Sequence, residues 1–174
     1  MLARFMVAAL VWLLMVGRAY AYELAGVEQP DPSITHTEAP ELTPYVAGAL
    51  REWGQTSAIV DGGPGGELTV ALGETRPGAA AQAEWWTNSS TIVACEVTIG
   101  TSWPDWSEAL RFEVVAHEIG HCLGLAHSPG GIMSPTVITT SPPSFTVDDR
   151  EGVATLYPPV RFGHSQYIPM VSGP

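Results

Sequence analysis

The spacing of apolar residues predicts a chain in which strands and helices are interspersed. Runs with a period of two or with many β-branched residues predict four strands, at residues 33–38, 57–61, 67–72 and 91–99. Apolar spacing of three to four residues, together with capping residues, predicts helices at residues 44–54, 106–123 and 146–157. Residues 79–86 fit neither state clearly by propensity, so the pattern alone leaves them open.

Capping residues and glycines mark the ends of these elements. Asp105, with Glu108 three residues later, matches a capping box and predicts that the longest helix starts at Trp106. Gly124 ends this helix, because glycine readily adopts the positive φ of a helix C-terminus. The stretch at 62–66, GGPGG, predicts a loop between two strands.

The first residues have the layout of a secretory signal peptide. Residues 5–16 are uniformly apolar, and Ala19 and Ala21 form an Ala-x-Ala cleavage pattern. A membrane span needs about twenty apolar residues, so this run is short for one. We expect cleavage after Ala21 and a secreted or extracellular product, with the periplasm or the cell surface as other destinations. An uncleaved signal-anchor is the alternative.

Composition limits the partners that the protein can have. The 174 residues are enough for one domain, and they carry 18 acidic residues against 7 arginines and no lysine. The net charge of −11 argues against nucleic acid and against an anionic membrane surface as partners. We therefore expect a single domain over residues 22–174, with no membrane contact after signal cleavage. The oligomeric state is not fixed by the sequence, and a monomer is the simplest expectation.

Cys95 and Cys122 are the two cysteines of the chain. Cysteines in an exported protein commonly pair, so we expect a disulfide between them. The alternative is two buried free thiols. A metal-binding role is the weaker interpretation, because no Cys-x-x-Cys spacing is present.

Three of the chain's five histidines lie within residues 117–127. His117 and His121 are four apart on the predicted helix, so their side chains share one face and can reach one metal ion. After the turn at Gly124, His127 can supply a third nitrogen. Three imidazoles with an open fourth position are typical of a catalytic zinc site, and Glu118 is placed to act as the base for water. His36 and His164 are isolated, and we interpret them as surface or packing residues.

The stretch HEIGHCLGLAH, residues 117–127, resembles the zinc-binding motif of the metzincin metallopeptidases. Ser128 directly after the third histidine is similar to the matrixin branch, and Met133 resembles the methionine of the Met-turn beneath the zinc. The resemblance covers residues 33–158 and leaves 159–174 as an irregular tail. It implies an α+β fold with a twisted mixed sheet, about three helices and an edge strand at residues 78–84.

The same resemblance implies a secreted zinc-dependent endopeptidase. Zinc held by His117, His121 and His127 would activate water, and Glu118 would act as general base. A protein or peptide substrate would lie extended beside residues 79–86. Two alternatives stay open: a zinc-containing peptide-binding pseudoenzyme and a hydrolase of a non-peptide amide. Trp85–Trp86 and Trp103 with Trp106 could line the cleft, although aromatic residues mostly serve packing.

Some features depart from the matrixin pattern. Gln82 occupies the position of a histidine that holds a second, structural zinc in matrixins, so we expect one zinc, the catalytic one. No calcium site can be assigned. Residues 22–32 contain no cysteine that could block the zinc as the matrixin propeptide does, so we expect a protein without that latch. The segment between His127 and Met133 is shorter than is usual in matrixins.

Overall fold

The computed structural model describes residues 24–136 and 144–159. The predicted signal peptide, His164 and the C-terminal tail lie outside the described residues. The elements are as follows: β1 (Ser33–Glu38), η2 (Pro40–Leu42), α2 (Thr43–Gly54), β2 (Val60–Pro64), β3 (Leu68–Gly73), β4 (Ala81–Asn88), β5 (Thr91–Gly100), η3 (Trp103–Asp105), α3 (Glu108–Cys122) and α4 (Val147–Leu156).

A five-stranded mixed sheet forms one layer of the fold, in the order β2-β1-β3-β5-β4. The first four strands of this order run parallel to their neighbours, and β4 runs antiparallel to β5. Strand β4 is therefore an edge strand, as the matrixin resemblance implies. Its pairing with β5 extends from Ala81↔Ile99 to Asn88↔Thr91. The pairing places residues 81–86, which propensity alone left open, in a strand that begins later and ends later than the predicted 78–84, while residues 79 and 80 lie before it.

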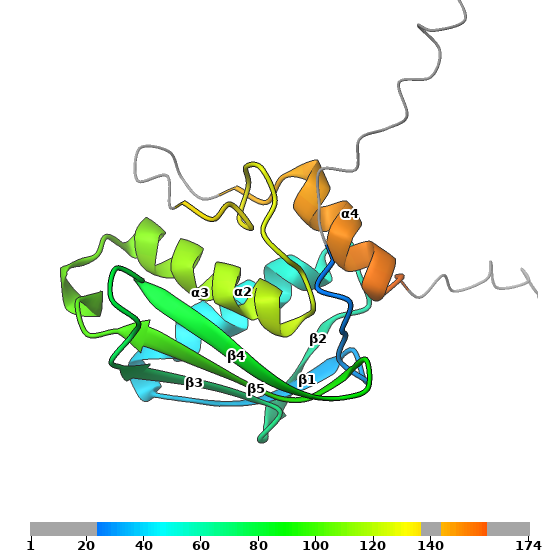
Figure 1. Cartoon of the computed structure of the whole chain (residues 1–174), viewed down its shortest axis with the longest axis horizontal. Coiled ribbons are helices and arrows are strands. Elements are labelled where there is room, and N and C mark those ends of the chain that lie inside the picture. The colour runs from blue at the N-terminus through cyan, green and yellow to red at the C-terminus, as the bar shows by residue number, and fades with distance from the viewer. Residues whose placement is uncertain (1–23, 137–143, 160–174) are drawn as a thin grey trace, which may run out of the picture.

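Helices α2 and α3 pack together and form the second layer, with α3 beside β4 (Figure 1). The two helices and the sheet enclose one hydrophobic core that includes Trp53, Ile119 and Leu68. The indole Nε1 of Trp53 donates a hydrogen bond to the carbonyl oxygen of Ala116 at 3.1 Å. Because Ala116 precedes His117, this bond fixes α3 against α2 directly below the histidine pair. No helix among the described residues is long and apolar enough to cross a bilayer.

The predicted start of α3 was wrong. The helix begins at Glu108 and not at Trp106, and its N-cap is Ser107, whose Oγ accepts a hydrogen bond from the Leu110 amide at 3.2 Å. Asp105 lies instead in the short 3-10 helix η3. The chain becomes extended at Trp106 before α3 begins, so Asp105 has no helical N–H to cap.

The predicted loop at residues 62–66 was also wrong in part. Strand β2 starts at Val60, later than predicted, and continues through Gly62 and Gly63 to Pro64. Gly62 lies so close to β1 that a Cβ there would meet the Ser33 hydroxyl at 2.8 Å. The glycines therefore permit close strand contact here and do not form an open loop.

His36 is a packing histidine in this sheet. Its Nδ1 lies 2.6 Å from the Glu38 carboxylate, and its Nε2 lies 3.0 Å from the Asp61 carboxylate. Burial of the ring opposes its protonation, but the two carboxylates outweigh burial and raise the pKa of His36 above its ordinary 6.5. The charged ring thus ties β1 to β2.

Replacing His36 with Gln is expected to remove a pH-dependent part of the stability. A group whose pKa is raised by folding stabilises the fold fully below its unfolded-state pKa, and this contribution is lost as the pH rises through the folded-state value. The stability advantage of wild type over His36→Gln should be largest below pH 6.5 and shrink above it. Urea denaturation of both proteins across this range measures the advantage. An advantage that stays constant or grows with pH would contradict the assignment.

The expected disulfide is confirmed. Cys95 of β5 is bonded to Cys122, the last residue of α3, and both residues are buried. The bond joins the sheet to the helix directly beside His121. It is thus placed to hold the end of the histidine-bearing helix against β5.

Removing the disulfide with Cys95→Ala/Cys122→Ala is expected to lower the free energy of unfolding by about 3 kcal/mol. The bond joins residues 27 positions apart, and without it the unfolded chain gains conformational entropy. Urea denaturation measures the change, and wild type unfolded in the presence of a reductant is the control. The reduced wild type should resemble the double variant. An unchanged unfolding midpoint in both would refute the stabilising role.

Candidate metal centre and active site

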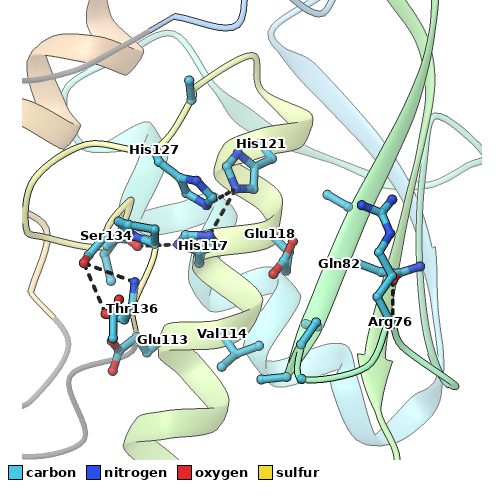
Figure 2. Close-up of a pocket in the computed structure, with 18 of the residues that line it drawn as sticks. Arg76, Gln82, Glu113, Val114, His117, Glu118, His121, His127, Ser134 and Thr136 are labelled. Carbon is cyan, nitrogen blue, oxygen red and sulfur yellow. Dashed lines mark hydrogen bonds between the residues drawn. The ribbon is translucent and has the colours of Figure 1, made fainter.

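Three histidine side chains converge at the C-terminal end of α3 (Figure 2). His117 and His121 project from the helix, and His127 reaches back from the segment that follows it. The Nε2 of His121 lies 3.1 Å from that of His117 and 3.2 Å from that of His127. Histidine, cysteine and acidic side chains are the candidate metal ligands of the described residues. These three histidines have ligand atoms close enough together to share one metal ion.

Hydrogen bonds on the outer side of two rings fix their tautomers. The Nδ1 of His117 donates to the Ile132 carbonyl at 2.7 Å, and the Nδ1 of His121 donates to the Leu125 carbonyl at 2.8 Å. The proton of each neutral ring is therefore on Nδ1, and the lone pair of Nε2 points toward the other histidines. Lone pairs facing one another at this distance repel unless a cation lies among them. The arrangement fits a metal ion, with backbone carbonyls orienting the ligands.

Burial keeps these rings neutral. It lowers the pKa of His117, and it lowers the pKa of His121 to about 4, where the neighbouring His117 adds to the effect. A histidine must be neutral to bind a metal ion, so at neutral pH no proton competes for these two positions.

Gly124 provides the turn that brings His127 into the group. Its φ is +95°, and a Cβ at this position would collide with the carbonyl oxygen of Val27. The chain leaves α3 here, with the Leu125 amide donating to the Gly120 carbonyl at 3.0 Å. A residue with a Cβ fits neither this φ angle nor the space beside Val27. The position of His127 therefore depends on a glycine at residue 124.

Met133 lies behind the histidine-bearing helix. It is 2% exposed and packs against α3 so closely that a Cβ on Gly120, the residue before His121, would collide with its sulfur. The Ser128 amide donates to the Met133 carbonyl at 2.9 Å and closes the loop between them. Gly120 has no side chain and so leaves room for the methionine on this side of α3.

Asp149 supports this segment, and the sequence analysis missed that role. Its carboxylate is 1% exposed and accepts hydrogen bonds from the amides of Ile132 and Met133, each at 3.1 Å. It also completes a capping box with Thr146 at the start of α4. From the sequence, Asp149 is only an acidic residue in the first turn of the helix predicted at residues 146–157. Nothing in the local pattern points to the partners 16 and 17 residues earlier.

Glu118 lies on α3 between the two helical histidines and faces the space between α3 and β4 (Figure 2). Its side chain lines the same cavity as all three histidines. Burial raises the pKa of Glu118 to about 7. A carboxyl group with this pKa can accept and release a proton near neutral pH.

The cavity at this site has a volume of about 920 Å³. Strand β4 and the preceding loop form one wall, α3 forms the floor, and the segment around Ser134 forms the other wall. Glu113, one turn before His117, also lines it, as does Trp85. Trp103 does not; it is buried and packs edge-on against Tyr45 with ring centroids 4.9 Å apart.

Gln82 lies on β4, as the matrixin resemblance implies. Its side-chain oxygen accepts a hydrogen bond from the Arg76 amide at 3.0 Å, and the Arg76 guanidinium donates to Glu84 at 2.9 Å. These polar contacts link β4 to the loop before it.

Comparison with known proteins decides the family. Residues 62–158, which include the three histidines, Glu118 and Met133, match the matrixin family. The chain belongs to the matrixin family. Matrixins are zinc-dependent endopeptidases, and the histidine group accords with that dependence.

Several matrixins are similar to this chain over part of their length. Interstitial collagenase of Bos taurus is 32% identical over 106 residues, which are 56% of this chain and 19% of that protein. Matrix metalloproteinase-20 of Homo sapiens is 48% identical over 52 residues, which are 28% of this chain and 11% of that protein. The chain thus spans less than a fifth of each of these relatives.

The fold is similar to the solved structure of myroilysin. The TM-score is 0.54 at 13% sequence identity, and the match covers 79% of this chain and 98% of that chain. At this identity the likeness concerns the fold alone. It confirms the predicted metzincin-like architecture, in which a mixed sheet and three helices carry the histidine motif.

Proposed function

We propose that this matrixin is a secreted zinc-dependent endopeptidase in which Glu118 is the general base. The observation that carries the proposal is a buried carboxyl group beside three converging imidazole nitrogens, in a cavity that is open along an edge strand. Each part of this arrangement has a separate task in peptide hydrolysis.

His117, His121 and His127 hold one zinc ion in this proposal. A zinc ion with three imidazole ligands and an open fourth position supplies Lewis acidity to water and to the scissile carbonyl. The backbone carbonyls of Ile132 and Leu125 keep the Nε2 atoms of the two helical histidines directed at the ion. Met133 packs behind the helix and keeps the ligands from moving away.

Glu118 moves the proton. Its carboxylate takes a proton from the attacking water as the new carbon–oxygen bond forms, and it gives that proton to the amine nitrogen as the peptide bond breaks. Burial by itself raises the pKa of Glu118 to about 7. A nearby dication favours the ionised form, which is the form that a general base needs.

Strand β4 positions the substrate. One side of β4 is paired with β5, so a peptide can add along the other side and form backbone hydrogen bonds as a further strand. This places an extended peptide in the cavity between β4 and the segment around Ser134, above Glu118 (Figure 2). Protein and peptide substrates meet this requirement.

The proposal includes export. Residues 1–21 would direct secretion and be removed, leaving one domain from Tyr22 onward. The Cys95–Cys122 disulfide supports this, because such bonds persist in oxidising compartments outside the cytosol.

Digestion of casein by the purified, zinc-loaded protein tests the proposal. We expect cleavage that stops when a chelator removes the metal and that returns with about one zinc per chain. Elemental analysis of the same samples gives the metal content. Bound zinc without cleavage of any protein would overturn the proposal in favour of a peptide-binding protein. Turnover of small amides alone would favour a non-peptide amidase.

A further inference from the structure

Trp85 is a large apolar side chain that remains partly exposed inside the candidate cleft. It lies on β4, is 36% exposed and lines the same cavity as Glu118 and the three histidines. Its ring centroid lies 6.3 Å from that of His121, with the planes tilted by 34°. One part of the indole is thus placed against a candidate zinc ligand while another part is open to an incoming ligand.

The alternation of β4 places Trp85 in line with two small residues. Ala81, Ala83 and Trp85 share one face of the strand, because side chains alternate with a period of two. This face is directed at α3, since Trp85 is paired with Cys95, which is bonded to Cys122 of that helix. A peptide lying along β4 therefore passes two alanines and then meets one tryptophan at the His121 end of the cleft.

An aromatic ring at this point can discriminate among peptide side chains. Stacking or edge-on contact of an apolar side chain with Trp85 would remove apolar surface of both groups from water. The Trp85 ring centroid lies 6.3 Å from that of His121, so a peptide side chain that contacts this ring belongs to a residue near the cut on the His121 side. The small side chains of Ala81 and Ala83 provide no comparable contact.

We propose that Trp85 forms a specificity subsite that binds an aromatic or large aliphatic side chain of the peptide, at one position near the scissile bond on the His121 side. This inference rests on the proposed function as a peptidase. The occupant is a side chain of the substrate, because the ring is continuous with the cavity that holds Glu118 and the histidines.

Trp86 provides a matched control on the same strand. It is more exposed than Trp85, at 51%, and alternation places it on the opposite face of β4. It lines a second, smaller hollow that Trp85 also borders, but it does not line the cavity of the histidines. Replacing either residue with alanine removes the same indole, but only Trp85 faces the proposed path of the peptide.

The first test determines by mass spectrometry where a mixture of casein-derived peptides is cleaved. It compares wild type with the variants Trp85→Ala, Trp85→Phe and Trp86→Ala. Wild type should show enrichment of phenylalanine, tyrosine, leucine or tryptophan at one position on one side of the cut. For peptides with Phe or Ala at that position, Trp85→Ala should lower the Phe-to-Ala ratio of kcat/KM by about tenfold. Trp85→Phe should keep most of the ratio, and Trp86→Ala should keep all of it. Zinc content, measured in parallel, separates loss of the subsite from loss of the metal.

A second readout does not need turnover. Zinc-loaded Glu118→Gln protein, with and without Trp85→Ala, is titrated with fluorescein-labelled alanine-rich nonapeptides that carry one Phe at successive positions. Binding that is strengthened by Phe at one position, and only when Trp85 is present, supports the subsite. If Phe-containing peptides bind through Trp85 but are never cut by wild type, the subsite stands and the peptidase function fails. If wild type cuts peptides and the profile is the same in Trp85→Ala, the subsite is overturned and the peptidase function stands.

Discussion

Replacing Glu118 with Gln is expected to reduce peptide hydrolysis by roughly 10²- to 10⁴-fold, the usual contribution of general acid–base catalysis. Glutamine has nearly the same shape as glutamate but cannot take the proton of the attacking water. It also cannot return that proton to the leaving amine, so both proton transfers fail together. The effect should appear in kcat, because Glu118 acts on the proton and does not hold the peptide.

The same variant should retain its zinc. Glu118 projects toward β4, whereas the ligand atoms of the three histidines converge on one another (Figure 2). Zinc content and peptide binding therefore separate loss of the base from loss of the site. Cleavage of casein at the wild-type rate by zinc-loaded Glu118→Gln would exclude Glu118 as the base. Loss of zinc together with activity would mean that the carboxylate helps to bind the metal.

Replacing Asp149 with Ala is expected to lower the free energy of unfolding by about 2–6 kcal/mol, because each of two buried amides left without an acceptor costs about 1–3 kcal/mol. The carboxylate is buried and accepts bonds from the amides of Ile132 and Met133 and from Thr146. Without it, two buried amides lose their acceptor, and α4 loses half of its capping box. Zinc affinity should fall as well, because the carbonyl that orients His117 belongs to Ile132.

Asp148→Ala is the matched control for this change. Asp148 lies in the same first turn of α4, where its negative charge interacts favourably with the helix dipole as that of Asp149 does. Unlike Asp149, it accepts no observed hydrogen bond from Ile132 or Met133. Its removal should lower the free energy of unfolding by no more than about 1 kcal/mol. Urea denaturation and a competitive zinc titration compare the two variants. Equal effects of both substitutions would show that Asp149 acts only through the helix terminus.

The histidine group could be predicted from the sequence because local geometry determines most of it. Residues four apart on an α-helix always share a face, so His117 and His121 had to point the same way. Gly124 marked the turn after the helix, and His127 followed within reach of it. The disulfide was predictable on different grounds, because only two cysteines were present to pair.

The start of α3 and the extent of β2 were predicted less well because two local signals competed in each case. Asp105 and Ser107 both precede helical residues, but the extended backbone at Trp106 separates η3 from α3, so Ser107 and not Asp105 caps α3. The glycines at 62 and 63 favour a turn by propensity, but pairing of β2 with β1 draws them into the strand.

By itself, the sequence predicted which histidines come together and the metzincin-like fold around them. The motif at residues 117–127 is short, and the helix period and one glycine convert its spacing directly into a three-dimensional group. The tertiary structure alone decided that the edge strand runs over residues 81–88, that Asp149 holds the Met133 segment, and that Trp85 and not Trp86 faces His121. These features depend on strand pairing and on contacts between residues far apart along the chain. Propensity and periodicity describe a residue and its near neighbours, and so they do not specify which distant elements will meet.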